Sequence, residues 1–399
     1  MKVLVIGGGA AGLTASITAA ARGAEVTLLE KNDRVGRKIL ATGNGRCNLM
    51  NTGAPAYAHG KDLAETQLSR WGTDGIRAFF DACGLLIAAE PEEDGRLYPA
   101  CGQAAAVLDA LRARAADLKV QVRTDESCTR IEKTKRGFTA HTPGNAYPAD
   151  RVILCCGSPA GGGSDSYSLA TALGHSLVPL VPALCPLECD MRAFRAFKGL
   201  RVPAVLSLYA GERFVSRAGG ECLFAESGLS GIPAMQLAAD AAEAMRNRRC
   251  LVRMDLSPLL NLAPRKHFYT RTVPENHEDA ALRFLESRSH LPSGPLRGAL
   301  PRPMAEYAER TAPTPNDTAR LLTSWPFAVT GTRAKNAQVI RGGISAREVD
   351  PVTMQSRLVP GLFLCGEMLD VDGDCGGFNL MFAWASALSA GEAAARGKE

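Results

Sequence analysis

The chain has 399 residues, of which 46% are hydrophobic and 22% charged, and 46 Lys and Arg against 41 Asp and Glu give a net charge of +5. This composition is typical of globular proteins and excludes disordered, collagen-like and disulfide-scaffold chains. The charge is too small for a protein that binds nucleic acid mainly by electrostatic attraction, so no nucleic-acid partner is expected. At roughly 100–200 residues per domain, the length predicts two or three domains.

Twelve cysteines are scattered along the chain, and no C-x-x-C motif occurs. Paired cysteine spacings are typical of structural zinc sites and secreted scaffolds, so we expect neither, and no metal site. Single buried cysteines suit a reducing compartment, and the sequence predicts a cytoplasmic protein.

Two uncharged stretches imitate a membrane span or an export signal. The first, residues 3–21, lies between Lys2 and Arg22. It passes from an aliphatic burst through three glycines into an alanine-rich stretch, which predicts strand, turn and helix. The second, residues 375–391, is short for a span and predicts a buried helix. We therefore expect no membrane segment and no targeting signal.

The string GGGAAG at residues 7–12 lies between a predicted strand, residues 3–6, and a predicted helix, about residues 10–22. A second strand, residues 25–29, ends in Glu30. This order is typical of a dinucleotide-binding turn. The Glu30 carboxylate suits ribose hydroxyls and would repel a 2′-phosphate, so the predicted ligand is FAD or NAD rather than NADP. The alternative is a glycine turn with a surface glutamate.

The three glycines of the motif have separate tasks. Gly7 allows the tight turn, and Gly9 lets backbone N–H groups approach a pyrophosphate at the helix N-terminus. Gly12 lets the helix pack closely on the sheet.

The next segment distinguishes FAD from NAD. Residues 31–51 are basic, polar and glycine-rich, and no second strand–helix repeat follows at once. Such an excursion suits a chain that surrounds an extended ligand, with Arg37 and Lys38 near phosphates and residues 43–45 beneath a planar ring. A disulfide reductase would carry a C-x4-C pair here, and the single Cys47 excludes that class.

The chain then changes character. Helical spacing over residues 100–118 is followed by strand-like pieces at 120–123, 127–132, 137–141 and 151–155. The glycine-rich residues 157–165 lack the pattern of a second dinucleotide site. We expect the first part of the FAD domain, which begins at residue 1, to end at residue 184.

The inserted part has two sections. Residues 185–262, with strands near 203–215 and a helix at 233–246, predict a β-rich substrate domain. Residues 263–325 are charged and interrupted by prolines, and predict a helical cap region. Residues 326–399 are expected to return to the FAD domain.

The returning segment carries a second glycine-rich region. A buried strand, residues 362–365, runs into Gly366 and Glu367, and a carboxylate at this place suits ribityl hydroxyls. The aspartates at 370, 372 and 374 alternate as in a calcium loop, but the glutamate that an EF-hand needs is absent. A helix that starts near residues 376–379, with free N–H groups toward a flavin pyrimidine, explains the region better.

Short strings give the sequence a resemblance that runs nearly from end to end. They are GGGAAG at 7–12, GRK at 36–38, GNGRCNLMN at 43–51, GRLYP at 95–99, GLSG at 228–231, RGGIS at 341–345, TMQS at 353–356 and GLFLCGEMLDVDGDCGGFNL at 361–380. They resemble the flavoprotein family that includes aminoacetone oxidase and the bile-acid 3-dehydro-4-reductases, within the two-dinucleotide-fold superfamily. The resemblance implies one FAD per chain and an α/β fold, with a discontinuous Rossmann-like FAD-binding domain, an inserted β-rich part and a helical part.

By position, the resemblance implies a set of FAD contacts, with Cys128 meeting the adenine through its backbone from a strand. The set is Gly7, Gly9, Ala10, Ala11, Gly12, Glu30, Lys31, Arg37, Lys38, Gly43, Asn44, Gly45, Arg46, Cys47, Asn48, Cys128, Cys156, Gly157, Gly366, Glu367, Asp374, Gly376, Gly377, Phe378, Asn379 and Leu380. Two departures from the family make transfer of a subfamily function unsafe: Cys155-Cys156-Gly157-Ser158 replaces A-T-G-G, and Phe378 replaces a more usual Tyr.

The leading functional hypothesis is an oxidoreductase in which flavin N5 exchanges a hydride with a small-molecule substrate. In one version, NADH or NADPH docks transiently and the hydride reaches an electron-poor C=C of an enone, possibly steroid-like, as in the bile-acid branch. Tyr98 is the candidate proton donor, and Arg46 and Arg96 are candidates to polarise a carbonyl. A structural role for Tyr98 is an equal alternative.

Other functions stay open on the sequence alone. An amine or aminoketone oxidase would reoxidise the flavin with O2, with Lys38 or Arg46 as a cation near the ring. A flavin-dependent RNA-modifying protein has support only from basic patches at 246–249 and 264–310. A non-catalytic FAD sensor is the fourth reading, and the oligomeric state is open.

Overall fold

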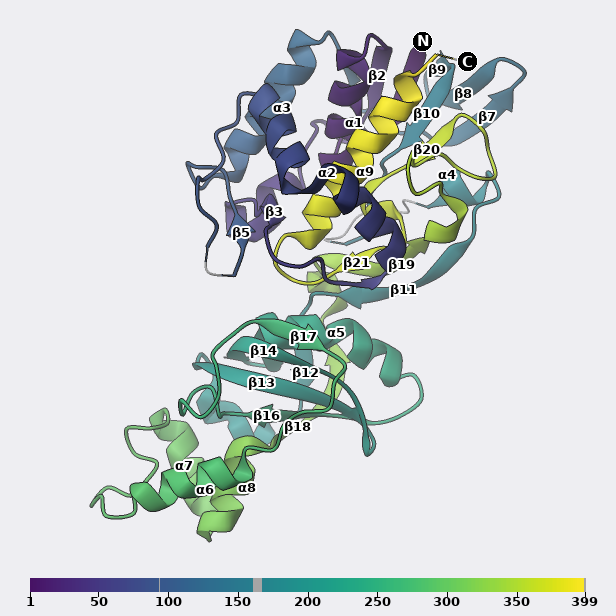
Figure 1. Ribbon diagram of the computed structural model, residues 1–399. Coiled ribbons are helices and arrows are strands. Elements are labelled where there is room, and N and C mark those ends of the chain that lie inside the picture. The colour runs from purple at the N-terminus through teal and green to yellow at the C-terminus, as the bar shows by residue number, and fades with distance from the viewer. Residues whose placement is uncertain (93, 161–166, 398–399) are drawn as a thin grey trace. The chain divides into compact units, whose positions relative to one another are not determined.

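The computed structural model describes residues 1–92, 94–160 and 167–397. It divides into two compact units, each continuous in space (Figure 1). The first unit comprises Met1–Leu180 and Ile340–Glu399, and the second comprises Val181–Val339. The chain thus leaves the first unit once and returns to it, as expected for a discontinuous domain.

A five-stranded parallel sheet forms the centre of the first unit. Its strand order is β20-β10-β1-β2-β6. The strands are β1 (Lys2–Ile6), β2 (Glu25–Leu29), β6 (Gln121–Arg123), β10 (Arg151–Leu154) and β20 (Leu362–Leu364). β1, β10 and β20 carry aliphatic side chains that are almost wholly buried, because other elements of the unit cover both faces of the sheet. The carboxyl ends of β1, β2, β10 and β20 therefore meet at one edge, where the nucleotide motifs lie.

Four longer helices belong to this unit. They are α1 (Ala10–Ala21), α2 (Lys61–Ala82), α3 (Ala104–Asp117) and α9 (Phe378–Ala395). α1 and α9, from opposite ends of the chain, pack along each other (Figure 1). Gly391 allows this contact, because a Cβ there would lie 2.6 Å from the Ala15 carbonyl oxygen. The predicted buried helix at 375–391 thus begins at Phe378, after two glycines.

Smaller elements complete the first unit. They are the pairs β3 (Met50–Asn51) with β5 (Arg96–Leu97) and β4 (Tyr57–His59) with β21 (Asp372–Gly373), the antiparallel β7 (Arg130–Thr134), β8 (Gly137–His141) and β9 (Ala146–Ala149), and the short α4 (Ser168–Thr171). β11 (Leu177–Ala183) pairs with β19 (Val339–Ile344). The sequence pattern missed β9, in which an alanine-rich alternation includes Pro148. Residues 161–166 of the glycine-rich stretch after β10 lie outside the described residues.

The second unit is an antiparallel barrel. Its strands follow the order β13-β16-β18-β12-β15-β14, and a further pairing between β13 and β14 closes the ring. They are β12 (Leu187–Cys189), β13 (Arg201–Ala210), β14 (Arg213–Ala225), β15 (Gly228–Gly231), β16 (Cys250–Asp255) and β18 (Trp325–Thr332), with the short β17 (Phe268–Thr270) added to β14. Closure leaves few exposed strand edges.

Helices of the second unit are α5 (Ile232–Ala244), α6 (Glu278–Ser287), α7 (Arg302–Thr311) and α8 (Pro315–Thr323). Aromatic side chains from β14, β18, α7 and the 3-10 helix Arg192–Phe197 form a cluster in this unit. They include Phe194, Phe197, Phe224, Tyr307, Trp325 and Phe327, with ring centroids 4.7–5.8 Å apart. Such edge-on and tilted pairs stabilise beyond the area that they bury.

Two expectations about elements differ from the structure, whereas the strands expected near 203–215 are present as β13 and β14, with a turn at Gly211 between them. The segment after residue 325 stays in the second unit as β18, which pairs with β16 and β12, so the return to the first unit comes at Ile340. Cys128 lies outside any strand, in the connection between β6 and β7.

Among the described residues, no helix has the length and hydropathy that a membrane crossing requires.

Candidate functional site

The glycine turn between β1 and α1 is closed on one side and open on the other. Gly7 has φ +104°, and its N–H donates to the Leu29 carbonyl at 2.8 Å. A Cβ at Gly7 would lie 2.4 Å from the Cys155 carbonyl oxygen, and one at Gly12 would lie 1.7 Å from the Gly7 oxygen. A Cβ at Gly9 would meet nothing within 4 Å. The open side at Gly9 is where a pyrophosphate can approach the backbone.

Two helices begin at this site without a side-chain cap. Gly9 is the N-cap of α1 and Gly377 is the N-cap of α9. At neither helix start does a described side chain cap the free N–H groups by a hydrogen bond. Gly366 stands close to α1, because a Cβ there would lie 2.7 Å from that of Ala11. Free N–H groups and the positive ends of two helix dipoles suit a ligand that is negative at its phosphates and electron-rich at its ring.

Glu30 stands at the end of β2 and is buried. Its carboxylate accepts hydrogen bonds from the N–H groups of Gly8, at 2.8 Å, and Asn32, at 2.9 Å. Arg37 Nη1 donates to the Asn32 side-chain oxygen at 3.1 Å, so Arg37 reaches this end of the site through Asn32. The carboxylate is thus fixed beside the glycine turn, where a ribose would lie.

Cys156 lies near the residues that the sequence assigned to the adenosine end of FAD. Burial raises the pKa of its thiol to about 12, Cys128 and Glu30 also raise it, and the positive charge of Lys31 lowers it. These side chains therefore lie close enough to influence one another. Cys128 lies near Glu30 and Lys31 in a connecting segment and not in a strand.

Lys38 lies among groups from two other strand ends. Its Nζ donates to the Ser158 carbonyl at 2.7 Å and lies 3.5 Å from Glu367 Oε2. Gly157 is adjacent, with φ +70°. The lysine thus joins the ends of β10 and β20, on the side that the sequence assigned to phosphates and ribityl hydroxyls.

The segment over residues 42–48 has an unusual backbone. Gly43, Asn44, Gly45 and Cys47 all have positive φ, between 54° and 83°. Left-handed backbone at non-glycine residues is uncommon and clusters at functional sites. Cys47 is fully buried, and its burial raises the thiol pKa to about 11.

The start of α9 is held by three neighbouring segments. Asn51 Nδ2 donates to the carbonyls of Gly376, at 2.9 Å, and Asp94, at 3.1 Å. Asn379 exchanges two hydrogen bonds with the backbone of Gly373, and the Asp374 N–H donates to the Ala56 carbonyl at 2.9 Å. At the same helix start, the Phe378 carbonyl accepts a hydrogen bond from the Tyr57 hydroxyl at 2.8 Å. Leu380 is half-buried there.

The aspartates before α9 have protein partners. Asp370 bonds His59 at 3.1 Å, and Asp372 forms a buried ion pair with Arg341 at 2.6 Å. No group of three or more candidate ligands for a metal ion occurs among the described residues. The alternating aspartates therefore anchor β21 against β4 and β19.

The three candidate catalytic side chains lie on this edge of the first unit. The Arg46 guanidinium stacks on the Tyr98 ring, 3.8 Å from its centroid, and pairs with Glu92 at 2.9 Å. Tyr98 is 7% exposed, and its ring edge would lie 3.5 Å from a Cβ at Gly43. Arg96 pairs with Asp94 at 2.8 Å, and its Nε would lie 3.9 Å from a Cβ at Gly376.

The residues present fit FAD. The Oε1 atom of Glu367 and the Oδ1 atom of Asn48 are buried acceptors without a hydrogen-bond donor among the described residues. A buried acceptor without a donor is costly, and FAD offers ribityl hydroxyls and a ring N–H as donors. A Cβ at Gly377 would lie 2.9 Å from that Asn48 oxygen, so only glycine leaves room there. The open face of Gly9 and the two uncapped helices match the same ligand.

Sequence reasoning missed two residues of the site. Asn51 closes the string GNGRCNLMN and was not singled out, although a buried amide at a strand end indicates a bridging role. Glu92 carried no signal, because an acidic residue in a charged loop is most often solvated.

Comparison with known proteins agrees with this geometry. The family described as HI0933-like protein Rossmann domain matches residues 1–393. A 3-dehydro-bile acid delta(4,6)-reductase of Clostridium scindens is 34% identical over 99% of both chains. A ribosomal RNA dihydrouridine synthase of Escherichia coli is 26% identical over 96% of this chain and 95% of that protein.

A solved structure shows the same fold at low identity. The 3-ketosteroid-delta4-(5alpha)-dehydrogenase of Rhodococcus jostii RHA1 has a TM-score of 0.50 and 17% identity, over 99% of this chain and 96% of that one. The full-length matches agree with the fold and with the residues that fit FAD in the first unit. The chain belongs to the HI0933-like Rossmann family and is an FAD-dependent oxidoreductase.

Proposed function

We propose that the protein is an NAD(P)H-driven reductase of a C=C bond conjugated to a carbonyl group, with a small enone as substrate. The proposal rests on the type of reaction that two relatives with different substrates have in common. One is named as a reductase of a 3-dehydro-bile acid, and the other as a synthase of dihydrouridine. Reduction of an enone and reduction of the uracil ring both saturate a C=C beside a carbonyl.

FAD, when bound, would supply the chemistry of hydride transfer from a nicotinamide to an electron-poor carbon. The residues that would hold it are those of the glycine turn, Glu30, Lys38, Asn48, Glu367 and the start of α9. Lys38 and the two helix N-termini place positive charge at this edge, which favours the reduced, more negative cofactor.

The chain's own residues would complete the reaction on the substrate. Tyr98 would donate the proton that the α-carbon needs after hydride arrives at the β-carbon. Arg46 and Arg96 would hydrogen-bond the carbonyl oxygen and stabilise the negative charge that develops there. Glu92 and Asp94 hold these two guanidinium groups in fixed directions, so little reorganisation is needed. The buried surroundings of Tyr98 would keep water from competing for this proton transfer.

A second candidate function is the same reduction on a uracil ring within RNA. The relative from Escherichia coli supports it by name, and so does the distribution of charge. Lys and Arg outnumber Asp and Glu within Val181–Val339, whereas the two sets nearly balance in the first unit. A charge asymmetry of this kind favours a polyanionic partner. RNA binding that weakens steeply with salt, together with reduction of uridine, would support this candidate over the enone.

An oxidase that acts on an amine or aminoketone is distinguished by the electron donor. NADH, NADPH and aminoacetone should each be mixed with the holoprotein without oxygen, while the oxidised-flavin absorption band is followed by stopped flow. We expect rapid bleaching by one of the nicotinamides and none by the amine. Bleaching by aminoacetone alone would contradict the reductase. If no donor bleaches the flavin, a non-catalytic FAD-binding role replaces both enzymatic readings.

A further inference from the structure

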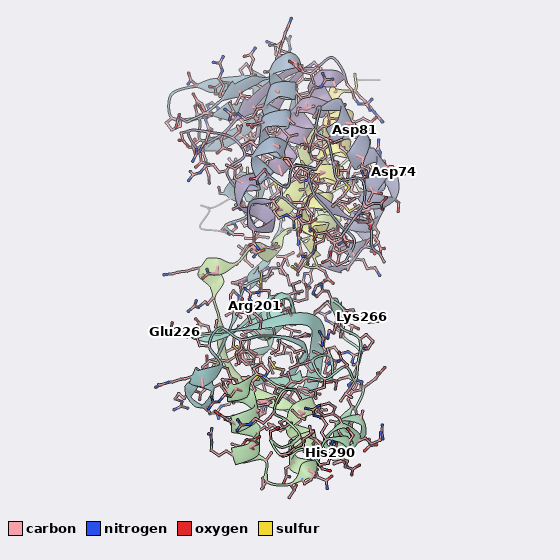
Figure 2. All side chains as sticks on the ribbon, turned by 90° about the vertical axis from the view of Figure 1, so that its left-hand side faces the viewer. Asp74, Asp81, Arg201, Glu226, Lys266 and His290 are labelled. Atoms are coloured by element: carbon pink, nitrogen blue, oxygen red, sulfur yellow. The ribbon has the colours of Figure 1, made fainter. Side chains whose placement is uncertain are left out.

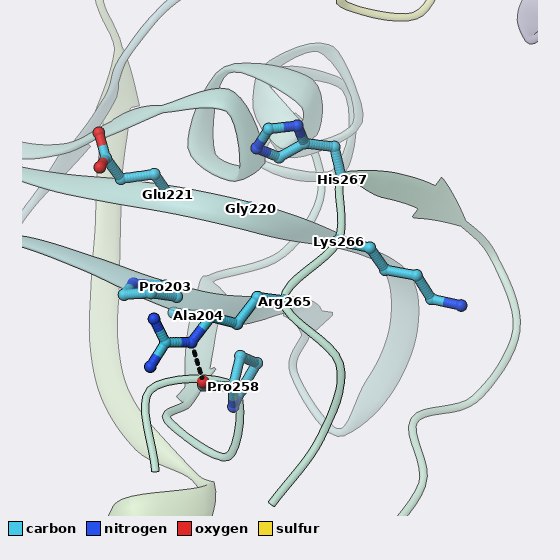
Figure 3. A pocket seen from close by; sticks show the side chains of 8 residues that line it. All are labelled: Pro203, Ala204, Gly220, Glu221, Pro258, Arg265, Lys266 and His267. Carbon is cyan, nitrogen blue, oxygen red and sulfur yellow. Dashed lines mark hydrogen bonds between the residues drawn. The ribbon is translucent and has the colours of Figure 1, made fainter. Parts of the chain in front are cut away.

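The second unit has a hollow of about 140 Å³ that the proposed reaction does not use (Figure 3). Two neighbouring residue pairs of β13 and β14 form its floor. They are Ala204 with Gly220 and Pro203 with Glu221. Ala204 and Gly220 carry little or no side chain, which leaves room over this part of the sheet. Pro258 and the segment before β17 form the wall.

Arg265 lines the hollow and is held rigidly by neutral partners. Its Nε donates to the Pro258 carbonyl at 2.9 Å (Figure 3), and its Nη2 donates to the Asn261 side-chain oxygen at 3.0 Å and the Leu259 carbonyl at 3.3 Å. Within the described chain, it has no carboxylate partner. These bonds orient the guanidinium, no carboxylate of a described residue neutralises its charge, and its Nη1 has no bond to a described residue. This is an arrangement suited to an oxyanion.

Neighbouring charges support the same ligand. Lys266 also lines the hollow, forms no ion pair with a described residue, and projects from the surface of this unit (Figure 2). Its ammonium points away from Arg265 in Figure 3, so it contributes charge more than contact. The one carboxylate of the lining, Glu221, is paired with Arg201 at 2.7 Å. The His267 ring lies beside Gly220, where a Cβ would be 2.6 Å from it.

The volume limits what can enter. A hollow of about 140 Å³ is smaller than the roughly 300–1,000 Å³ of typical small-molecule sites, so it suits one end of a ligand and not a whole one. We propose that this hollow binds the terminal phosphate or carboxylate of a small molecule, with Arg265 as the contacting residue. The rest of the ligand would lie outside the hollow.

The test is binding to the holoprotein by isothermal titration calorimetry, without an electron donor, so that it is independent of the proposed reaction. The probes are inorganic phosphate and cholate, a steroid carboxylate. We expect at least one of them to bind. Arg265→Ala should weaken that probe about tenfold or more, because it removes a charged hydrogen bond. Lys266→Ala, which removes no hydrogen bond within the protein, should weaken it by a smaller factor of about two to five.

Two further variants make the outcome decisive. Glu221→Gln should tighten binding, because it removes the negative charge of the lining and frees Arg201. Arg213→Ala, a matched loss of one exposed arginine elsewhere on β14, should leave binding unchanged. No binding of either probe, weaker binding in Glu221→Gln, or equal losses in Arg265→Ala and Arg213→Ala would each overturn the proposal. Binding of cholate but not of phosphate would identify the source as a carboxylate.

Discussion

Replacing Gly12 with alanine is expected to abolish FAD retention and to destabilise the first unit. The added Cβ would lie 1.7 Å from the Gly7 carbonyl oxygen, which belongs to the turn itself and has no room to move. The clash should lower the free energy of unfolding by about 3 kcal/mol or more. The measurements are the flavin-to-protein absorbance ratio after gel filtration and the Tm with and without added FAD.

Gly9→Ala is the matched control for this variant. Its Cβ would meet nothing within 4 Å, and the backbone at Gly9, with φ −82°, suits any residue. The protein should therefore fold with a loss of about 1 kcal/mol or less. It should still bind FAD more weakly, because the methyl group occupies the side that the pyrophosphate approaches. Wild-type FAD affinity in both variants would contradict the placement of the cofactor at this turn.

Tyr98→Phe is expected to lower kcat for enone reduction by about 10²–10⁴-fold, the usual contribution of a positioned general acid. Reduction of the bound flavin by NAD(P)H should be unaffected, because that step needs no proton from the tyrosine. The ring should keep its packing, since Arg46 stacks on its face and the residue is buried. Stopped-flow measurement of the two half-reactions separates these effects.

The control for Tyr98→Phe is Tyr147→Phe, on β9 within the same unit. It should change neither half-reaction. If Tyr98→Phe slows both half-reactions equally, the phenol has a structural role. If it slows neither, the proton comes from another group.

The parallel core and the cofactor edge could be predicted because their signals are local. Four apolar residues, a glycine turn and an acidic residue at the next strand end are each read over a few positions, and the structure has them as β1, α1 and Glu30. The helix start after Gly377 was visible for the same reason. Local glycines specify backbone that other residues rarely adopt.

Other features depend on residues far apart in the sequence. The bridge from Asn51 to Gly376 joins positions 325 residues apart, and the pair of Lys38 with Glu367 depends on the meeting of strand ends. The boundary at Ile340 could not be found either. β18 alternates buried and exposed residues as a strand of either unit would, and only its pairing with β16 and β12 assigns it to the barrel.

Cys128 is a candidate site residue whose predicted setting is wrong. The apolar pattern near residues 127–132 suggested a strand, but regular pairing begins at Arg130. The residues before Arg130 form a connecting segment, and in it Cys128 lies close to Cys156 and Glu30.

The most direct test of the proposed reaction is the oxidative half-reaction. Holoprotein reduced without oxygen should be mixed in separate experiments with a 3-keto-4-ene steroid, with air-saturated buffer and with a uridine oligonucleotide, while return of the oxidised-flavin band is followed. The account predicts fast reoxidation by the enone, with formation of the saturated ketone, and slow reoxidation by oxygen. Fast reoxidation by oxygen with no reaction of the enone would contradict it and identify an oxidase, and reoxidation by the oligonucleotide alone would identify RNA as the substrate.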